Sequence, residues 1–171
     1  MTKPLLDFLP FISQLRRNHG LEHAVMHVLT ERFQGLIMAG ISGPRGFLLM
    51  ADLPTETVAD ASLEALKQLQ LGETDLAIHE HCGTNLASST VLAALTAWVV
   101  MAGTGSDSRL KLRRLPLAIL LAVLVFIFSK PLGPWLQRVL TTSAIPETMV
   151  LSQVTTQRVM GRNLHSITTR F

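Results

Sequence analysis

The chain has 171 residues, of which 48% are hydrophobic and only 16% are charged, whereas soluble domains carry about 25% charged residues. This composition excludes a disordered chain or a fibrous repeat, and the length fits one ordinary domain. The net charge is +3. This small excess does not indicate a nucleic-acid partner, because no basic stripe alternates with aromatic residues. The single cysteine, Cys82, excludes an internal disulfide framework.

The N-terminal part is predicted to begin with a helix over Pro10–Gln34. Its apolar residues recur at helical spacing and form one stripe, made of Leu21, Ala24, Val25, Val28 and Leu29. Two strands follow at Leu36–Met38 and Phe47–Ala51, joined by the turn-rich link Ser42–Gly46.

A second helix is predicted to start at Asp52 or Thr55, either of which can cap it, and to end at Leu71 before Gly72. Its inward residues are expected to be Val58, Ala59, Leu63, Leu66 and Leu69. Asp75–His79 alternates between apolar and polar residues and predicts a third strand, with His79 on the polar face.

Two apolar segments account for the low charge content. Leu86–Gly103 is uncharged over 18 residues, about 27 Å as a helix against a bilayer core of about 30 Å. Leu115–Phe128 is aliphatic and aromatic apart from Pro116 and can continue beyond Lys130, where Pro131 and Pro134 would kink it. A membrane hairpin is expected. The alternative is a pair of buried core helices in a soluble protein. The remainder of this short chain offers little polar surface with which to cover two such helices.

The orientation of the hairpin stays open. The loop Thr104–Arg114 carries Arg109, Lys111, Arg113 and Arg114, which places it in the cytoplasm by the positive-inside rule. The first 85 residues would then have to cross the membrane, although Met1–Leu15 lacks the apolar run of a cleavable signal peptide. The expected location is a membrane, with the side that the N-terminal domain faces unresolved.

Two further strands are predicted at Met149–Val159 and Leu164–Thr169, around a turn at Gly161–Asn163. Two spans return the chain to its starting side, so this tail can pair with the N-terminal sheet. The sequence therefore predicts an α+β membrane protein interrupted by a transmembrane hairpin. Its parts are an N-terminal domain (1–85), the hairpin (86–140) and a C-terminal β-hairpin (141–171).

The first chemical motif is His19-Gly20-Leu21-Glu22-His23, followed by His27. His19 and His23 are one helical turn apart and can reach a single divalent ion. Glu22 flanks this face and could act as a base toward a metal-bound water. The pattern H-x-x-E-H is the inverted zincin motif, although the same face could simply be solvated.

The second motif is His79-Glu80-His81-Cys82-Gly83-Thr84-Asn85. His79 and Cys82 are three residues apart in an expected turn, a spacing that suits two ligands of one ion. A helix beginning at Leu86, capped by Thr84 or Asn85, would favour the thiolate form of Cys82; the alternative is a free buried cysteine. The expected ligands are His19, His23, His79 and Cys82, and imidazole with thiolate favours zinc. The remaining histidines, His27, His81 and His165, are weaker candidates, and His165 is expected at the surface.

The blocks HGLEH (His19–His23) and HEHCGT (His79–Thr84), followed by a hydrophobic hairpin, resemble a family of uncharacterised bacterial membrane proteins. Its members pair H-x-x-E-H with H-P-x-C-G-T and have been predicted to be metal-dependent; here Glu80 stands in place of the proline. The resemblance implies a metal site without an assigned reaction, and a location in a bacterial inner (cytoplasmic) membrane. H-x-x-E-H is also similar to the inverted zincin peptidases over five residues. Their third ligand is a downstream glutamate, and the corresponding stretch here is an apolar span without one.

Two functions follow from these motifs. The first is a zinc-dependent, peptidase-like membrane hydrolase, in which Glu22 is the catalytic base and water occupies the fourth position. The second is a non-catalytic, membrane-anchored metal-binding assembly or scaffold protein, in which Cys82 completes four protein ligands. A structural membrane subunit whose histidines only form hydrogen bonds is the third alternative. The expected partners are the lipid bilayer and a membrane-protein partner or substrate.

Overall fold

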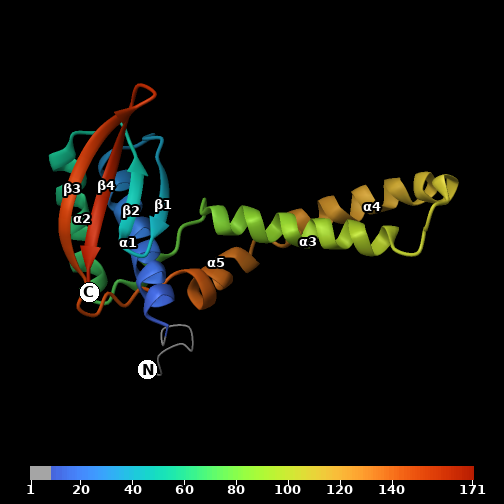
Figure 1. Ribbon diagram of the computed structural model, residues 1–171, viewed down its shortest axis with the longest axis horizontal. Coiled ribbons are helices and arrows are strands. Elements are labelled where there is room, and N and C mark those ends of the chain that lie inside the picture. Colours follow the sequence, from blue (N-terminus) through green and yellow to red (C-terminus); the bar gives the residue numbers. More distant parts are fainter. Residues whose placement is uncertain (1–8) are drawn as a thin grey trace. The chain divides into compact units, whose positions relative to one another are not determined.

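The computed structural model describes residues 9–171 (Figure 1). Contacts divide the chain into two compact units, Met1–His79 with Arg138–Phe171, and Glu80–Gln137. The expectation that Met1–Leu15 holds no signal peptide falls largely on residues 1–8, which lie outside the described residues. The protein is an α+β chain in which the sequence of the second unit interrupts that of the first.

The first unit is built on a four-stranded antiparallel sheet of order β1-β2-β4-β3. β1 is Ala39–Gly43, β2 is Gly46–Met50, β3 is Val150–Val159 and β4 is Arg162–Arg170. The tail pairs with the N-terminal strands, since Phe47 of β2 lies opposite Ile167 of β4. Figure 1 shows the helices of this unit on one face of the sheet.

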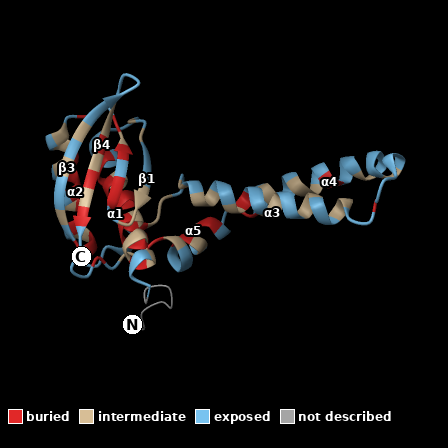
Figure 2. Ribbon diagram, in the orientation of Figure 1, coloured by how far each residue is buried: buried red, intermediate tan, exposed pale blue. Residues whose placement is uncertain are grey.

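The core lies between this sheet and two helices, α1 (Pro10–Arg32) and α2 (Thr55–Gln70). The expected stripe of α1 is wholly buried, and Phe47, Leu49 and Ile167 of the sheet belong to the same core. Figure 2 shows buried residues along α1. Each fully buried side chain of this size stabilises the fold by about 1.5–3 kcal/mol. One inward prediction for α2 is wrong: Leu63 is 58% exposed, while Ala61 and Ala65 are buried.

Two predicted strands are also wrong. Asp75–His79 is not a strand, because Thr74–Ala77 forms a 3-10 helix, η2, whose backbone bonds locally from Ile78 N–H to Asp75 O. This segment packs on α1 and pairs with none of the four strands. The strand predicted at Leu36–Met38 is absent there, and the first strand, β1, begins one residue later, at Ala39. β1 instead extends to Gly43, so the turn to β2 is confined to Pro44 and Arg45.

The second unit contains α3 (Gly83–Met101), α4 (Ser108–Phe128) and α5 (Leu132–Leu136). α3 starts three residues earlier than predicted because Cys82 is its N-cap, with the sulfur accepting from Thr84 N–H at 3.4 Å. α4 also starts early. Asp107 caps it by accepting from the N–H groups of Arg109 and Leu110, so the expected basic loop is its first turns.

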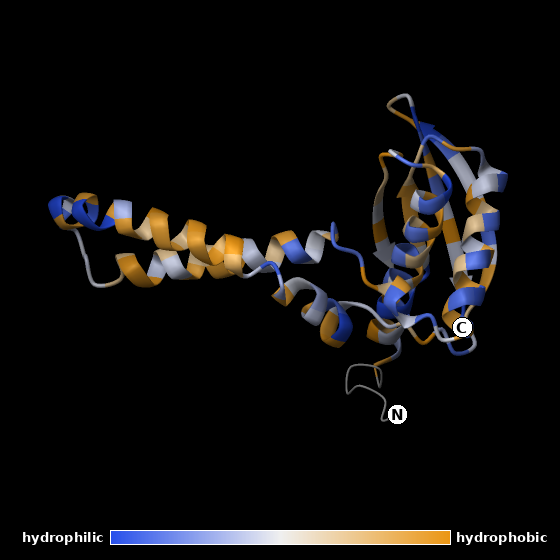
Figure 3. Ribbon diagram, turned by 180° about the vertical axis from the view of Figure 1, so that it is seen from behind, coloured by the Kyte–Doolittle hydropathy of each residue, from blue (hydrophilic) through white to orange (hydrophobic). Residues whose placement is uncertain are grey.

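α3 and α4 pack on each other and carry apolar residues along most of their length (Figure 3). α3 is long and apolar enough to cross a membrane, and only 6% of its apolar window is buried. The helix over Ser108–Phe128 meets that criterion only together with Leu132–Thr141, from which it is bent by 61°. This break contains Pro131, where the sequence predicts a kink.

Candidate metal centre

Two histidines of α1 lie ring against ring. His19 and His23 are separated by one helical turn, and their ring centroids are 4.4 Å apart at an interplanar angle of 63°. His23 is 2% exposed, whereas His19 is half-buried. The side of α1 that carries them packs against η2 and against the segment around Thr141.

Backbone carbonyls from two distant segments fix the orientation of these rings. His19 Nδ1 lies 3.0 Å from the carbonyl oxygen of Thr141, and His23 Nδ1 lies 2.9 Å from that of Ala77. A carbonyl oxygen can only accept, so Nδ1 must carry the proton in both rings. In the neutral imidazole the lone pair is then on Nε2. Metal-binding histidines are held in this way, with the other ring nitrogen donating to an oxygen acceptor.

The thiol of Cys82 joins this pair. One ligand atom each from His19, His23 and Cys82 lie within 4.8 Å of one another. Ligands of a tetrahedral zinc ion at 2.0–2.3 Å stand roughly 3.5 Å apart. The group can therefore hold a metal ion. Nothing in its geometry identifies the element.

His79 and His27 continue the row of imidazoles. The ring of His79 lies 5.8 Å from that of His23 and 5.2 Å from that of His27. His27 is held the opposite way round from His19 and His23, because its Nε2 lies 2.8 Å from the carbonyl oxygen of Ile78. Its lone pair is accordingly on Nδ1. Four rings thus follow one another in the order His19, His23, His79, His27.

Glu22 lies against β1. The carboxyl is buried, accepts a hydrogen bond from the Ser42 hydroxyl, and occupies the space that a side chain at Gly40 would fill. Burial raises the pKa of Glu22 above its usual value, and the Ser42 hydrogen bond and the charge of His19 partly offset this effect. The predicted catalytic base is therefore a packed carboxyl at the junction of α1 and β1.

Of the weaker candidates, His81 is exposed, and the surface prediction for His165 is wrong. His165 is completely buried on the inner face of β4. Its Nε2 donates to the carbonyl oxygen of Ala51 at 3.0 Å, and its Nδ1 accepts from the Thr156 hydroxyl at 2.7 Å. That hydroxyl also contacts the Thr55 hydroxyl at 2.7 Å. His165 therefore belongs to a buried polar chain and not to the metal group.

Sequence reasoning missed a supporting residue, Arg16. This arginine is 2% exposed, and its guanidinium donates to the carbonyl oxygens of Val139 and Thr142, at 3.1 and 3.0 Å. It thereby fastens to α1 the segment whose Thr141 carbonyl orients His19. A signal was present in the sequence, because Arg16 lies three residues before His19 and such residues share a helix face.

Comparison with known proteins matches residues 14–154 to the domain of unknown function DUF6391. The chain is also similar to an uncharacterized protein of Picosynechococcus sp. (strain ATCC 27264 / PCC 7002 / PR-6). The two are 30% identical over 166 residues, covering 87% of this chain and 77% of the relative. No solved structure matches the chain.

Proposed function

The chain belongs to the family of the domain of unknown function DUF6391, and from this premise we propose that it is a membrane-anchored metal-binding protein. Its α+β unit would bind a transition-metal ion, and its helical hairpin would hold that unit at a bilayer. The observation that carries the proposal is the proximity of two oriented imidazoles and a thiol, from His19, His23 and Cys82.

Ligand chemistry supports zinc as the ion. Imidazole and thiolate are soft to borderline donors that suit zinc and copper, whereas calcium and magnesium require oxygen ligands. The fixed Nδ1–H groups of His19 and His23 leave Nε2 lone pairs on neighbouring turns of one helix. Two such ligands need little reorganisation on binding, which favours affinity.

The hairpin supports the membrane anchor. Large apolar side chains are exposed along both helices, among them Leu95 and Trp98 of α3 and Leu120 of α4. Exposed apolar surface on this scale is costly in water and favourable in lipid.

The surroundings of Glu22 favour binding without turnover. Its carboxyl is engaged by Ser42 and packed against Gly40, so β1 accounts for its burial. A general base must come within hydrogen-bond reach of the proton that it removes. A carrier or assembly protein needs no such base, and this is the function that the geometry supports best.

A zinc-dependent hydrolase is the second candidate, and one observation favours it. Glu22 lies on α1 three residues after His19 and next to His23, so the same helix carries the carboxyl and two proposed metal ligands. In this mechanism water would occupy the fourth position, and Glu22 would accept its proton after moving away from Ser42.

Cobalt substitution tests the metal site. The full chain is purified in detergent, and Co²⁺ is added while the sulfur-to-cobalt charge-transfer absorption is recorded. We expect one tightly bound equivalent with this absorption, which Cys82→Ser abolishes and His23→Gln weakens strongly. His81→Ala is the matched control and should bind as the unsubstituted chain does. A protein that binds no metal, or that keeps the absorption after Cys82→Ser, would overturn the proposal.

The substitution Glu22→Gln separates the two candidates. It keeps the size of the side chain and an acceptor for Ser42 but removes the base. For a carrier, metal content and any cellular phenotype should be unchanged. For a hydrolase, cleavage of a mixed peptide library by the zinc-loaded chain should fall by about 10²–10⁴-fold at unchanged metal content.

A further inference from the structure

We propose that His27 and His79 form a second, outer metal position through which the ion reaches His19, His23 and Cys82. This inference rests on the proposed function, because it describes how the metal site is loaded. All the ring contacts that carry it lie within the first unit, on α1 and at the end of the segment that follows η2.

The separation of the two rings fits a shared ion. A ring centroid stands roughly 3.2 Å from a zinc ion bound at 2.0–2.1 Å, so two imidazoles at the tetrahedral angle have centroids about 5.2 Å apart. The centroids of His27 and His79 are 5.2 Å apart, at an interplanar angle of 67°. The separation of the centroids is therefore that of two imidazoles bound to one ion.

A single hydrogen bond prepares both members of the pair. His27 Nε2 donates to the carbonyl oxygen of Ile78 at 2.8 Å, which leaves the His27 lone pair on Nδ1. The peptide group that accepts this bond links Ile78 to His79. The contact that orients one ring thus also restrains the backbone that carries the other.

Ligand chemistry indicates the direction of transfer. His27 and His79 are half-buried, as are His19 and Cys82, and His23 is buried. Two imidazoles with water in the remaining positions bind an ion more weakly than a set that includes a thiolate. The outer pair can thus capture an ion from solvent and release it inward. His79 lies 5.8 Å from His23, close enough for the ion to exchange one ligand at a time.

Glutamine substitutions remove the outer ligands with little disturbance of the fold. In His27→Gln the side-chain amide can still donate to the Ile78 carbonyl but offers no nitrogen lone pair. His79→Gln likewise removes the imidazole nitrogen with which His79 would bind the ion. His81→Ala is again the control. Each full chain in detergent is titrated with Co²⁺, and the rate of loading is followed by stopped-flow absorption of the sulfur-to-cobalt band.

The unsubstituted chain should bind one tight equivalent with the charge-transfer band and a second, weaker equivalent without it. His27→Gln and His79→Gln should lose the second equivalent and load the first more slowly by about tenfold, a size typical of changes close to metal ligands. The final intensity of the band should be unchanged.

Three results would overturn the inference and leave the proposed function intact. They are a single equivalent in the unsubstituted chain, unaltered loading in both glutamine variants, or loss of the charge-transfer band in His79→Gln. The last would make His79 a ligand of the inner ion. Failure of every variant and of the unsubstituted chain to bind cobalt would overturn the proposed function as well.

Discussion

The Nδ1 atom of His23 lies 2.9 Å from the carbonyl oxygen of Ala77, which is 54 residues further along the chain. The equivalent bond of His19 reaches Thr141, 122 residues away. Tertiary structure, rather than the helix that carries these histidines, therefore determines which ring nitrogen holds the proton.

The first prediction concerns these tautomers. In the metal-free protein at a pH where the rings are neutral, His19 and His23 should carry the proton on Nδ1, and His27 should carry it on Nε2. Long-range ¹H–¹⁵N correlation spectra of the chain in detergent distinguish the two forms. The same tautomer in all three rings would contradict the hydrogen bonding described above.

The second prediction is that Arg16→Met destabilises the first unit by about 3 kcal/mol and weakens metal binding. The substitution keeps most of the aliphatic stem but removes two charged hydrogen bonds to buried carbonyls, each worth about 1.5–3 kcal/mol. Urea unfolding and cobalt titration measure the two effects.

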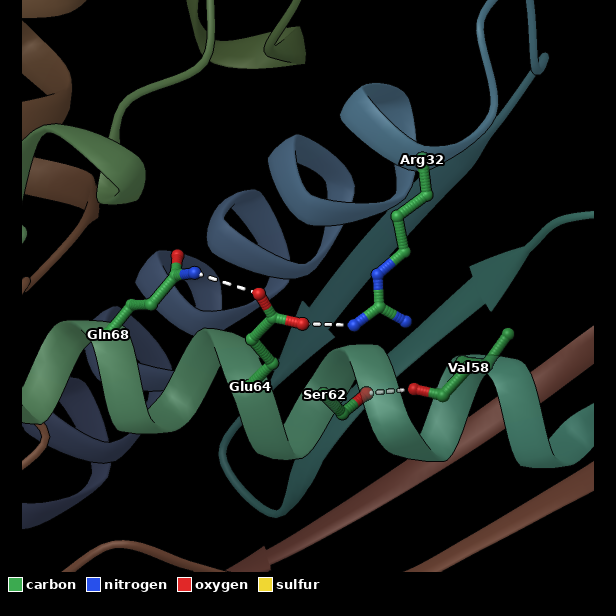
Figure 4. A network of polar contacts seen from close by, with 5 residues as sticks. All are labelled: Arg32, Val58, Ser62, Glu64 and Gln68. Carbon is green, nitrogen blue, oxygen red and sulfur yellow. Dashed lines mark hydrogen bonds and ion pairs between the residues drawn. The ribbon is translucent and has the colours of Figure 1, made fainter.

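Arg32→Met on the same helix is the matched control. Arg32 pairs with Glu64, which also accepts from Gln68 (Figure 4). Both side chains of the ion pair are more than a third exposed, and exposed pairs contribute about 0–1 kcal/mol. Equal losses of stability and metal affinity in Arg16→Met and Arg32→Met would mean that Arg16 does not specifically support the metal site.

The third prediction tests the buried polar chain of His165. Thr156→Val removes the hydroxyl that links Thr55 to His165 and leaves a buried nitrogen without its donor, at a cost of about 1–3 kcal/mol. Thr155→Val is the control, because its side chain is exposed on the same strand and should change stability by less than about 0.5 kcal/mol. Denaturant midpoints of the two variants should differ accordingly. Coincident midpoints would contradict the proposed stabilising role of the hydrogen bonds among Thr55, Thr156 and His165.

The fourth prediction concerns the membrane anchor. Leu95→Arg puts a charge in the middle of α3, where membrane insertion is disfavoured by about 2.5–3.5 kcal/mol. The substituted chain should partition less into the alkali-resistant membrane fraction of expressing cells. Leu71→Arg, at an exposed position of the first unit, should fractionate normally. A chain that is soluble before any substitution would refute the anchor.

Periodicity was sufficient to predict α1, α2 and the C-terminal strand pair, because their apolar faces repeat over many residues. It failed for Asp75–His79, where five alternating residues carry no information about whether a partner strand exists. Exposure of His165 could not be predicted either, since its burial depends on acceptors and donors from Ala51 and Thr156. The proximity of His19, His23 and Cys82 followed from motif chemistry. The carbonyls of Ala77 and Thr141 that orient the rings have no sequence signature.

The sheet order β1-β2-β4-β3 has a consequence for biosynthesis. β4, an inner strand, is translated after every other element, and all of α3 and α4 leaves the ribosome between β2 and β4. Until then Phe47 and Leu49 have no Ile167 to pack beside, so the core that they share is incomplete. The inner face of the sheet is therefore completed only after the apolar helices have been synthesised.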